Sequence, residues 1–245
     1  MNLWKLERLR MWRTQRLLIL LAVFGAVGLL GPLTATYLPE LLESLGEEAT
    51  SIAAMTAEDG ITQYIGNAIQ MGMLAVAFVG SAALAFDAKT EIAVFLRTRA
   101  AVPGIFLPRF VTVAVASVAA FSFGMAIAFV GTGFLLEWLD AIAVLIGTML
   151  FSVYMVFAVA VIGVVASVVR KVPAVALLSV GVLIVLALLG LVGPLAPWLP
   201  TALIGATDEL IRGEDFDYWR SVVVTLAATL GLVFASIALF ERREI

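Results

Sequence analysis

The chain has 245 residues, of which 63% are hydrophobic and 13% charged, and its formal net charge is -3. Soluble domains average roughly 45–50% apolar and about 25% charged residues, so lipid must solvate much of this chain. Cysteine and histidine are both absent. Their absence excludes disulfides, thiolate and imidazole metal ligands, and any catalytic triad that uses histidine as its base.

Residues 1–16 combine Trp4 and Trp12 with the basic residues Lys5, Arg8, Arg10, Arg13 and Arg16. Tryptophan and basic side chains are typical of the headgroup level of a membrane. The segment therefore predicts an N-terminal interfacial helix. The alternative is a basic tail that only sets the topology, because the apolar residues do not gather cleanly on one face.

Six segments are long and apolar enough to span a bilayer core of about 30 Å, which takes roughly 20 helical residues. They lie at about 17–38, 62–86, 105–136, 141–169, 173–193 and 220–240. The apolar run of the first extends to about Leu38 without a small-x-small cleavage pattern, which favours an uncleaved span over a signal peptide. The sequence thus predicts an all-α polytopic membrane protein with a single transmembrane domain over residues 1–245.

The basic residues predict the orientation of the spans. If the N-terminus is cytoplasmic, all of the 15 Lys and Arg residues except Arg212 and Arg220 fall in cytoplasmic segments. Positive charge concentrates on the cytoplasmic side of membrane proteins. We therefore expect both termini in the cytoplasm and a multi-pass protein of the cell (plasma) membrane.

The spans carry no Asp, Glu, Lys, Arg or His well inside the membrane, where ion-coupled carriers usually keep one. The strongest interior polar residues are Gln63, Asn67 and Gln70, whose i, i+4, i+7 spacing places them on one face of the second span. They are either interhelical hydrogen-bonding groups or the lining of a pathway. None of the lysines follows the glycine of a phosphate loop, so we expect no enzymatic activity in the chain itself.

Residues 86–110, "FDAKTEIAVFLRTRAAVPGIFLPRF", insert charges between two apolar runs. The helical "TEIAVFLRTRA" is longer than a connection between neighbouring spans requires, although a basic loop could also serve topology alone. A carboxylate follows the second span, then come a short helix with "FL", a proline-containing turn and the basic Arg109. This order resembles the coupling-helix segment of ABC-2-type (type V fold) ABC exporter permeases.

The basic N-terminal helix, the six-span plan and "GPLAPWLPTALIGATDELIRG" before the last span resemble the same family. The chain departs from its pattern in having no Gly-Thr after Glu91, and "AAVPG" stands where Pro-x-Ser-Arg is common. The resemblance implies a permease subunit without a cofactor of its own. Two ABC ATPase copies would supply ATP–Mg, and a second permease copy would complete a homodimer or heterodimer in the lipid bilayer, with no nucleic acid.

The resemblance also implies roles for particular residues. Glu91, Phe95, Arg97 and Arg99 would contact the ATPase through a coupling helix between the second and third spans. Independently of the resemblance, the spacing of Gln63, Asn67 and Gln70 makes them the candidates for the pathway. Trp198 and Pro200 would belong to an outer gate, formed by a re-entrant or interfacial hairpin before the sixth span; a loop resting on lipid is the alternative. The function classes left open are a membrane scaffold or maturation factor without a pathway, and a secondary carrier.

Overall fold

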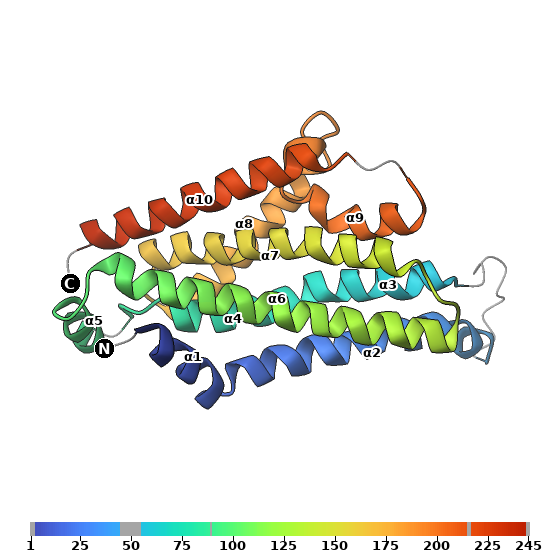
Figure 1. Cartoon of the computed structure of the whole chain (residues 1–245), viewed down its shortest axis with the longest axis horizontal. Helices are drawn as coiled ribbons and strands as arrows, with labels where there is room; N and C mark the ends of the chain where they lie inside the picture. The colour runs from blue at the N-terminus through green and yellow to red at the C-terminus, as the bar shows by residue number, and fades with distance from the viewer. Residues whose placement is uncertain (1–2, 45–54, 89, 215–216, 244–245) are drawn as a thin grey trace.

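A computed structural model of the chain describes residues 3–44, 55–88, 90–214 and 217–243, and every regular element in these ranges is helical (Figure 1). The elements are α1 (Leu3–Arg13), α2 (Arg16–Ser44), α3 (Ala57–Asn67), the π turn η1 (Ala68–Gly72), α4 (Met73–Leu84), α5 (Thr90–Arg97), α6 (Val102–Leu135), α7 (Ala141–Val168), α8 (Val172–Leu189), the 3₁₀ turn η2 (Ala196–Trp198), α9 (Ala202–Ile211) and α10 (Trp219–Arg242). The all-α prediction is confirmed for the described residues.

Six helical segments in the described part of the chain are long and apolar enough to cross a membrane. They cover Arg16–Leu38, Ala57–Leu84, Val102–Leu135, Ala141–Val168, Val172–Leu189 and Trp219–Arg242. These are the six segments expected from the sequence, with ends that differ by a few residues. The second starts earlier than predicted, because Thr56 and Asp59 form a capping box at its N-terminus.

The second span is one continuous helix that contains the π turn η1 between α3 and α4. The inner side of this turn lies against α2. A Cβ atom on Gly72 would sit 2.4 Å from the Phe24 ring, so only glycine permits this approach. The π turn therefore changes the helical register of the second span where Gly72 packs on the first span.

The core forms where α2, α3 and α7 pack on α6. Phe121 of α6 stacks on Phe151 of α7 with ring centroids 4.1 Å apart, and on Tyr64 of α3 at 5.5 Å. The Tyr64 hydroxyl donates a hydrogen bond to the Phe121 carbonyl oxygen over 2.6 Å. A Cβ on Gly28 would lie 2.4 Å from the Gly124 carbonyl oxygen, so α2 and α6 touch through their backbones.

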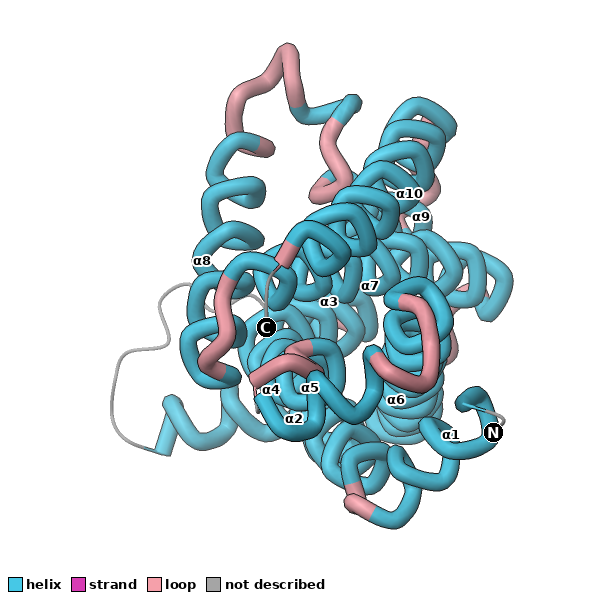
Figure 2. The backbone as a smooth tube through the Cα atoms, turned by 90° about the vertical axis from the view of Figure 1, so that its left-hand side faces the viewer, coloured by secondary structure: helices cyan, strands magenta, loops and turns pink. Residues whose placement is uncertain are grey.

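Helices α8 and α10 lie on one side of the bundle, opposite α1 and α2 (Figure 2). Each presents a row of exposed apolar side chains, including Leu177 and Val185 on α8 and Leu230 and Phe234 on α10. Such faces suit hydrocarbon, which agrees with a multi-pass membrane protein.

Candidate functional site

Helix α5 lies at the end of the bundle that also holds α1 and the C-terminal end of α10, and we call this end the α5 end (Figure 1). The helix begins at Thr90 and ends at Arg97. A turn over residues 98–100 follows the helix, Ala101 then adopts an extended conformation, and Pro103 occupies the first turn of α6, where a proline is favoured. A short helix is thus held between the second and third spans, as the sequence predicted for the coupling segment.

One side of α5 is exposed and the other is buried. Ala93 is fully buried, whereas Val94 and Glu91 are exposed and the Phe95 side chain is 51% exposed. The Arg99 guanidinium lies 4.4 Å from the centre of the Phe95 ring. The exposed side therefore has an apolar centre flanked by one carboxylate and one guanidinium, in a geometry that suits a protein partner.

Arg97 and Arg99 were predicted to share a role, but the structure separates them. The Arg97 guanidinium donates hydrogen bonds to the carbonyl oxygens of Phe240 and Arg243, both over 2.9 Å. These carbonyls lie at the C-terminus of α10, where a helix carries partial negative charge and unpaired acceptors. Arg97 therefore ties α5 to the end of the sixth span.

An ion pair beside these hydrogen bonds reinforces the contact between α5 and α10. Arg243 pairs with Asp87, with 2.8 Å between the guanidinium nitrogen and the carboxylate oxygen, and donates to the Ala166 and Val168 carbonyls over 3.3 Å each. We call Asp87, Arg97 and Arg243 the α5–α10 clasp. It joins the α4–α5 connection, the end of α7 and the end of α10 in one network.

Arg109, predicted only as the basic residue at the start of the third span, pairs with Glu7 of α1. The Arg109 Nε atom lies 3.0 Å from Glu7 Oε1, and the two side chains are 4% and 7% exposed. Arg109 also donates to the Ala83 carbonyl oxygen over 3.3 Å. The pair fixes α1 against the junction of α4 and α6. Sequence patterns missed it because its partners are 102 residues apart.

The predicted polar stripe of the second span is open to the outside of the single chain. Gln63, within α3, and Asn67, at its end, are half-buried, and Gln70 is exposed within η1. A π turn holds more residues than an α turn, so Gln70 is rotated away from the alignment that regular α spacing implies. Met71 and Phe78, further along the same span, are also exposed.

The predicted outer hairpin contains η2 and α9, and α9 packs along α7 at the end opposite α5 (Figure 1). A Cβ on Gly147 would lie 2.6 Å from the Thr207 Cα atom, so α7 and α9 are in close contact. Asp208 accepts a hydrogen bond from Thr62 of α3 over 2.5 Å. Of the predicted gate residues, Trp198 is exposed, whereas Pro200 is buried.

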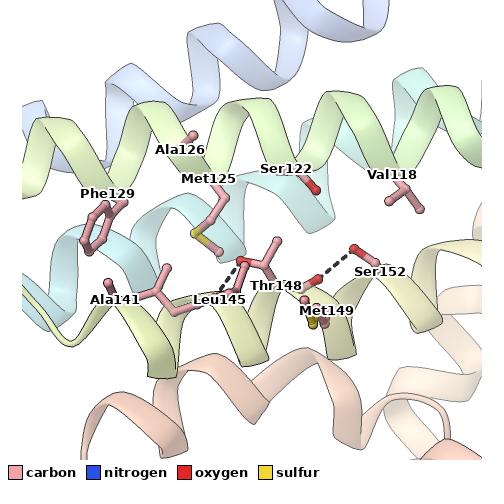
Figure 3. A pocket seen from close by; sticks show the side chains of 11 residues that line it. Val118, Ser122, Met125, Ala126, Phe129, Ala141, Leu145, Thr148, Met149 and Ser152 are labelled. Carbon is pink, nitrogen blue, oxygen red and sulfur yellow. Dashed lines mark hydrogen bonds between the residues drawn. The ribbon is translucent and has the colours of Figure 1, made fainter.

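A groove of about 500 Å³ runs between α6 and α7 (Figure 3). Its polar members include Thr148 and Ser152, which donate to the carbonyl oxygens of Val144 and Thr148 over 2.6 and 2.7 Å. Because these hydroxyls are already paired, the groove offers mainly apolar walls. Within the described ranges, no group of three or more Asp or Glu side chains is placed to hold a metal ion.

No family model and no curated protein matches this chain. The function is therefore inferred from the geometry of the α5 end and from the stripe on the second span.

Proposed function

We propose that the chain is the permease subunit of an ABC exporter of the ABC-2 type, driven by a separate ATPase subunit. The observation that supports this most directly is the two-sided geometry of α5. Its exposed side offers Glu91 and Phe95, and Arg99 reaches the Phe95 ring from the turn that follows the helix. The opposite side of α5 is fastened to α10 through Arg97. A helix that only connected two spans would need neither feature.

In this proposal the exposed side of α5 docks in a groove of the ATPase. Phe95 supplies the apolar contact, and Glu91 and Arg99 supply charge-assisted hydrogen bonds at its rim. Arg97 does not contact the partner but carries the displacement of α5 to α10. The clasp suits this role because both members of the Asp87–Arg243 pair are largely buried, so separating them would leave charges without partners.

The stripe on the second span supports a second permease copy. An amide facing lipid leaves polar groups without partners, and Gln70 is exposed in the single chain. We infer that this face meets either a water-filled pathway or the second copy, which can be identical to this chain or a related one. The proposed complex contains two permeases and two ATPases, and ATP–Mg binds only to the ATPases.

Orientation completes the proposal, with the α5 end and both termini in the cytoplasm of a cell whose plasma membrane holds the protein. The natural chain has no cysteine, so single cysteines can be introduced as reporters. In intact cells, Glu214→Cys should react with an impermeant maleimide from outside, and Arg99→Cys should react only after permeabilisation. External labelling at position 99 would refute the proposed orientation.

The test of the docking surface is co-purification with the proposed ATPase partner, to be sought among neighbouring reading frames that carry a Walker A motif. The permease alone should hydrolyse no ATP. Phe95→Ala and Arg99→Glu should each lose the ATPase while keeping the thermal stability of the isolated permease, because both side chains are exposed. Trp138→Ala is the matched control, since Trp138 is an exposed aromatic residue outside the α5 end.

Two results would count against the proposal. Unchanged co-purification of the Phe95 and Arg99 variants would refute the docking surface. A stable complex that hydrolyses ATP but moves nothing in proteoliposomes would favour a scaffold or maturation factor.

The two interpretations of the stripe separate under Asn67→Leu and Gln70→Leu, with Phe78→Leu as the control for a changed side chain on the same span. If the amides line the pathway, thermal stability should hold or rise while transport falls. If they bridge helices, stability should fall by about 0.6 kcal/mol for each amide, and the folded protein should still transport.

A further inference from the structure

A second groove, of about 310 Å³, lies between α1 and the first half of α6. Its apolar walls include Trp4 and Trp12 of α1, Leu17 of α2 and Val115 of α6, and its polar lining residues are Arg8 and Thr112. The Thr112 hydroxyl donates to the Pro108 carbonyl oxygen over 2.6 Å. Arg8 is therefore the group in this lining with charge to offer a ligand.

The groove exists because a backbone turn and an ion pair together hold α1 at an angle to the spans. Gln15 has a φ of 57°, a left-handed conformation that turns the chain sharply between α1 and α2. The Glu7–Arg109 pair then fastens the middle of α1 to the side of α6. Between Gln15 and the Glu7–Arg109 pair, α1 and α6 are separated by the groove.

The two parts of the groove suit different depths of a membrane. Trp12 is 72% exposed and Trp4 is also exposed, as expected for tryptophans at the boundary between headgroups and hydrocarbon. Val115, on the other wall, is 62% exposed and belongs to a membrane-spanning segment. One end of the groove thus lies at headgroup level beside a cation, and the other end lies against acyl chains.

The buried ion pair also sets the charge of the surface around the groove. Glu7 is the only acidic residue of α1, and its carboxylate is turned inward onto Arg109. The exposed charges of α1, among them Arg8 and Arg13, are consequently all positive. No carboxylate of this helix opposes an anion at the mouth of the groove.

We propose that this groove binds an anionic phospholipid, with an acyl chain against Leu17 and Val115 and the phosphate beside Arg8. A basic residue near a membrane surface favours anionic over zwitterionic lipid by about fivefold. This inference concerns α1, the start of α2 and α6, and does not depend on the proposed transport function.

The test uses fluorescence quenching by lipids with brominated acyl chains. Trp12, Trp138, Trp198 and Trp219 are replaced by Phe, which leaves Trp4 as the single fluorophore. The protein is reconstituted in phosphatidylcholine with increasing mole fractions of brominated phosphatidylglycerol or brominated phosphatidylcholine. We expect Trp4 quenching to reach half of its maximum at an about fivefold lower mole fraction of the brominated phosphatidylglycerol.

Three variants on this background define the site. Arg8→Gln should abolish the preference for phosphatidylglycerol while leaving the quenching by phosphatidylcholine unchanged. Lys171→Gln removes the same charge from an exposed position away from α1 and should keep the preference. Val115→Phe should reduce quenching by both lipids, because the larger side chain fills the groove from its exposed wall.

Three outcomes would overturn the proposal. Equal quenching by the two lipids in the parent protein would mean that only bulk lipid reaches Trp4. If Arg8→Gln and Lys171→Gln reduced the preference for phosphatidylglycerol equally, diffuse surface charge and not a site would attract the lipid. Absence of quenching by either lipid would mean that protein, such as a second copy of this chain, covers the groove.

Discussion

Replacing Glu7 by Gln should release α1 from the bundle, because it leaves Arg109 buried without a counter-charge. Arg109 is 4% exposed, and its remaining contacts would be the Ala83 carbonyl at 3.3 Å and the Phe86 ring at 5.3 Å. Removing one partner of a buried ion pair costs about 3–5 kcal/mol. The equilibrium constant for docking of α1 should therefore fall by a factor of roughly 150 to 5000.

The reciprocal change should cost less. Arg109→Gln leaves Glu7 near Arg10, whose guanidinium lies 3.7 Å away and is partly exposed to solvent. The double variant leaves neither charge unpaired, so it should be the least destabilised of the three. The expected order of destabilisation is Glu7→Gln, then Arg109→Gln, then the double variant.

Docking of α1 can be followed with a bimane fluorophore on Val115→Cys, because Trp4 and Trp12 line the same groove and quench bimane on contact. The temperature at which bimane emission rises gives the stability of the docked helix, and the variant with both Trp4→Phe and Trp12→Phe gives the unquenched baseline. Two results would refute the reasoning. If all three variants dequench at the parent temperature, the pair contributes nothing. If the double variant is as unstable as Glu7→Gln, an unpaired charge is not the cause.

Three further expectations concern Arg97, Gly124 and Glu209. Arg97→Gln should lower stability by about 1.5–3 kcal/mol through loss of charge-assisted hydrogen bonds to α10, whereas Arg99→Gln should not; thermal unfolding followed by tryptophan fluorescence compares them. Gly124→Ala should lower the free energy of unfolding by about 1–3 kcal/mol by separating α2 from α6. Gly231→Ala should be neutral or stabilising, because no atom of a neighbouring element lies within 4 Å of its Cβ position. Melting temperatures in detergent measure both, and equal effects would contradict the backbone contact between α2 and α6. The pKa of Glu209 is raised by desolvation and by the carboxylates of Glu214 and Asp208, so its contribution to stability is present below its unfolded-state pKa and is lost as the pH rises through its folded-state pKa. Glu209→Gln should remove that part of the pH dependence in unfolding measured from pH 4 to pH 8, and an unchanged profile would contradict this assignment.

Much of the architecture follows from the sequence alone. The six spans, their order and the short helix between the second and third are local properties, because they depend on runs of apolar residues and on the positions of proline and charge. Phe95 and Arg99, which are exposed in and just after α5, were also among the residues that the sequence singled out. The proposed role of these residues in contacting an ATPase was a prediction from the sequence pattern, and that pattern did not indicate the direction of each side chain.

Only the tertiary structure distinguished Arg97 from Arg99 and paired Glu7 with Arg109. The partners in these contacts are 102 to 146 residues apart, and no period in the sequence links them. The π turn in the second span is likewise a product of packing, since Gly72 must accommodate the Phe24 ring of another helix. Lipid selects the spans through the hydropathy of each segment by itself, whereas a buried charge finds its partner only after the helices have packed.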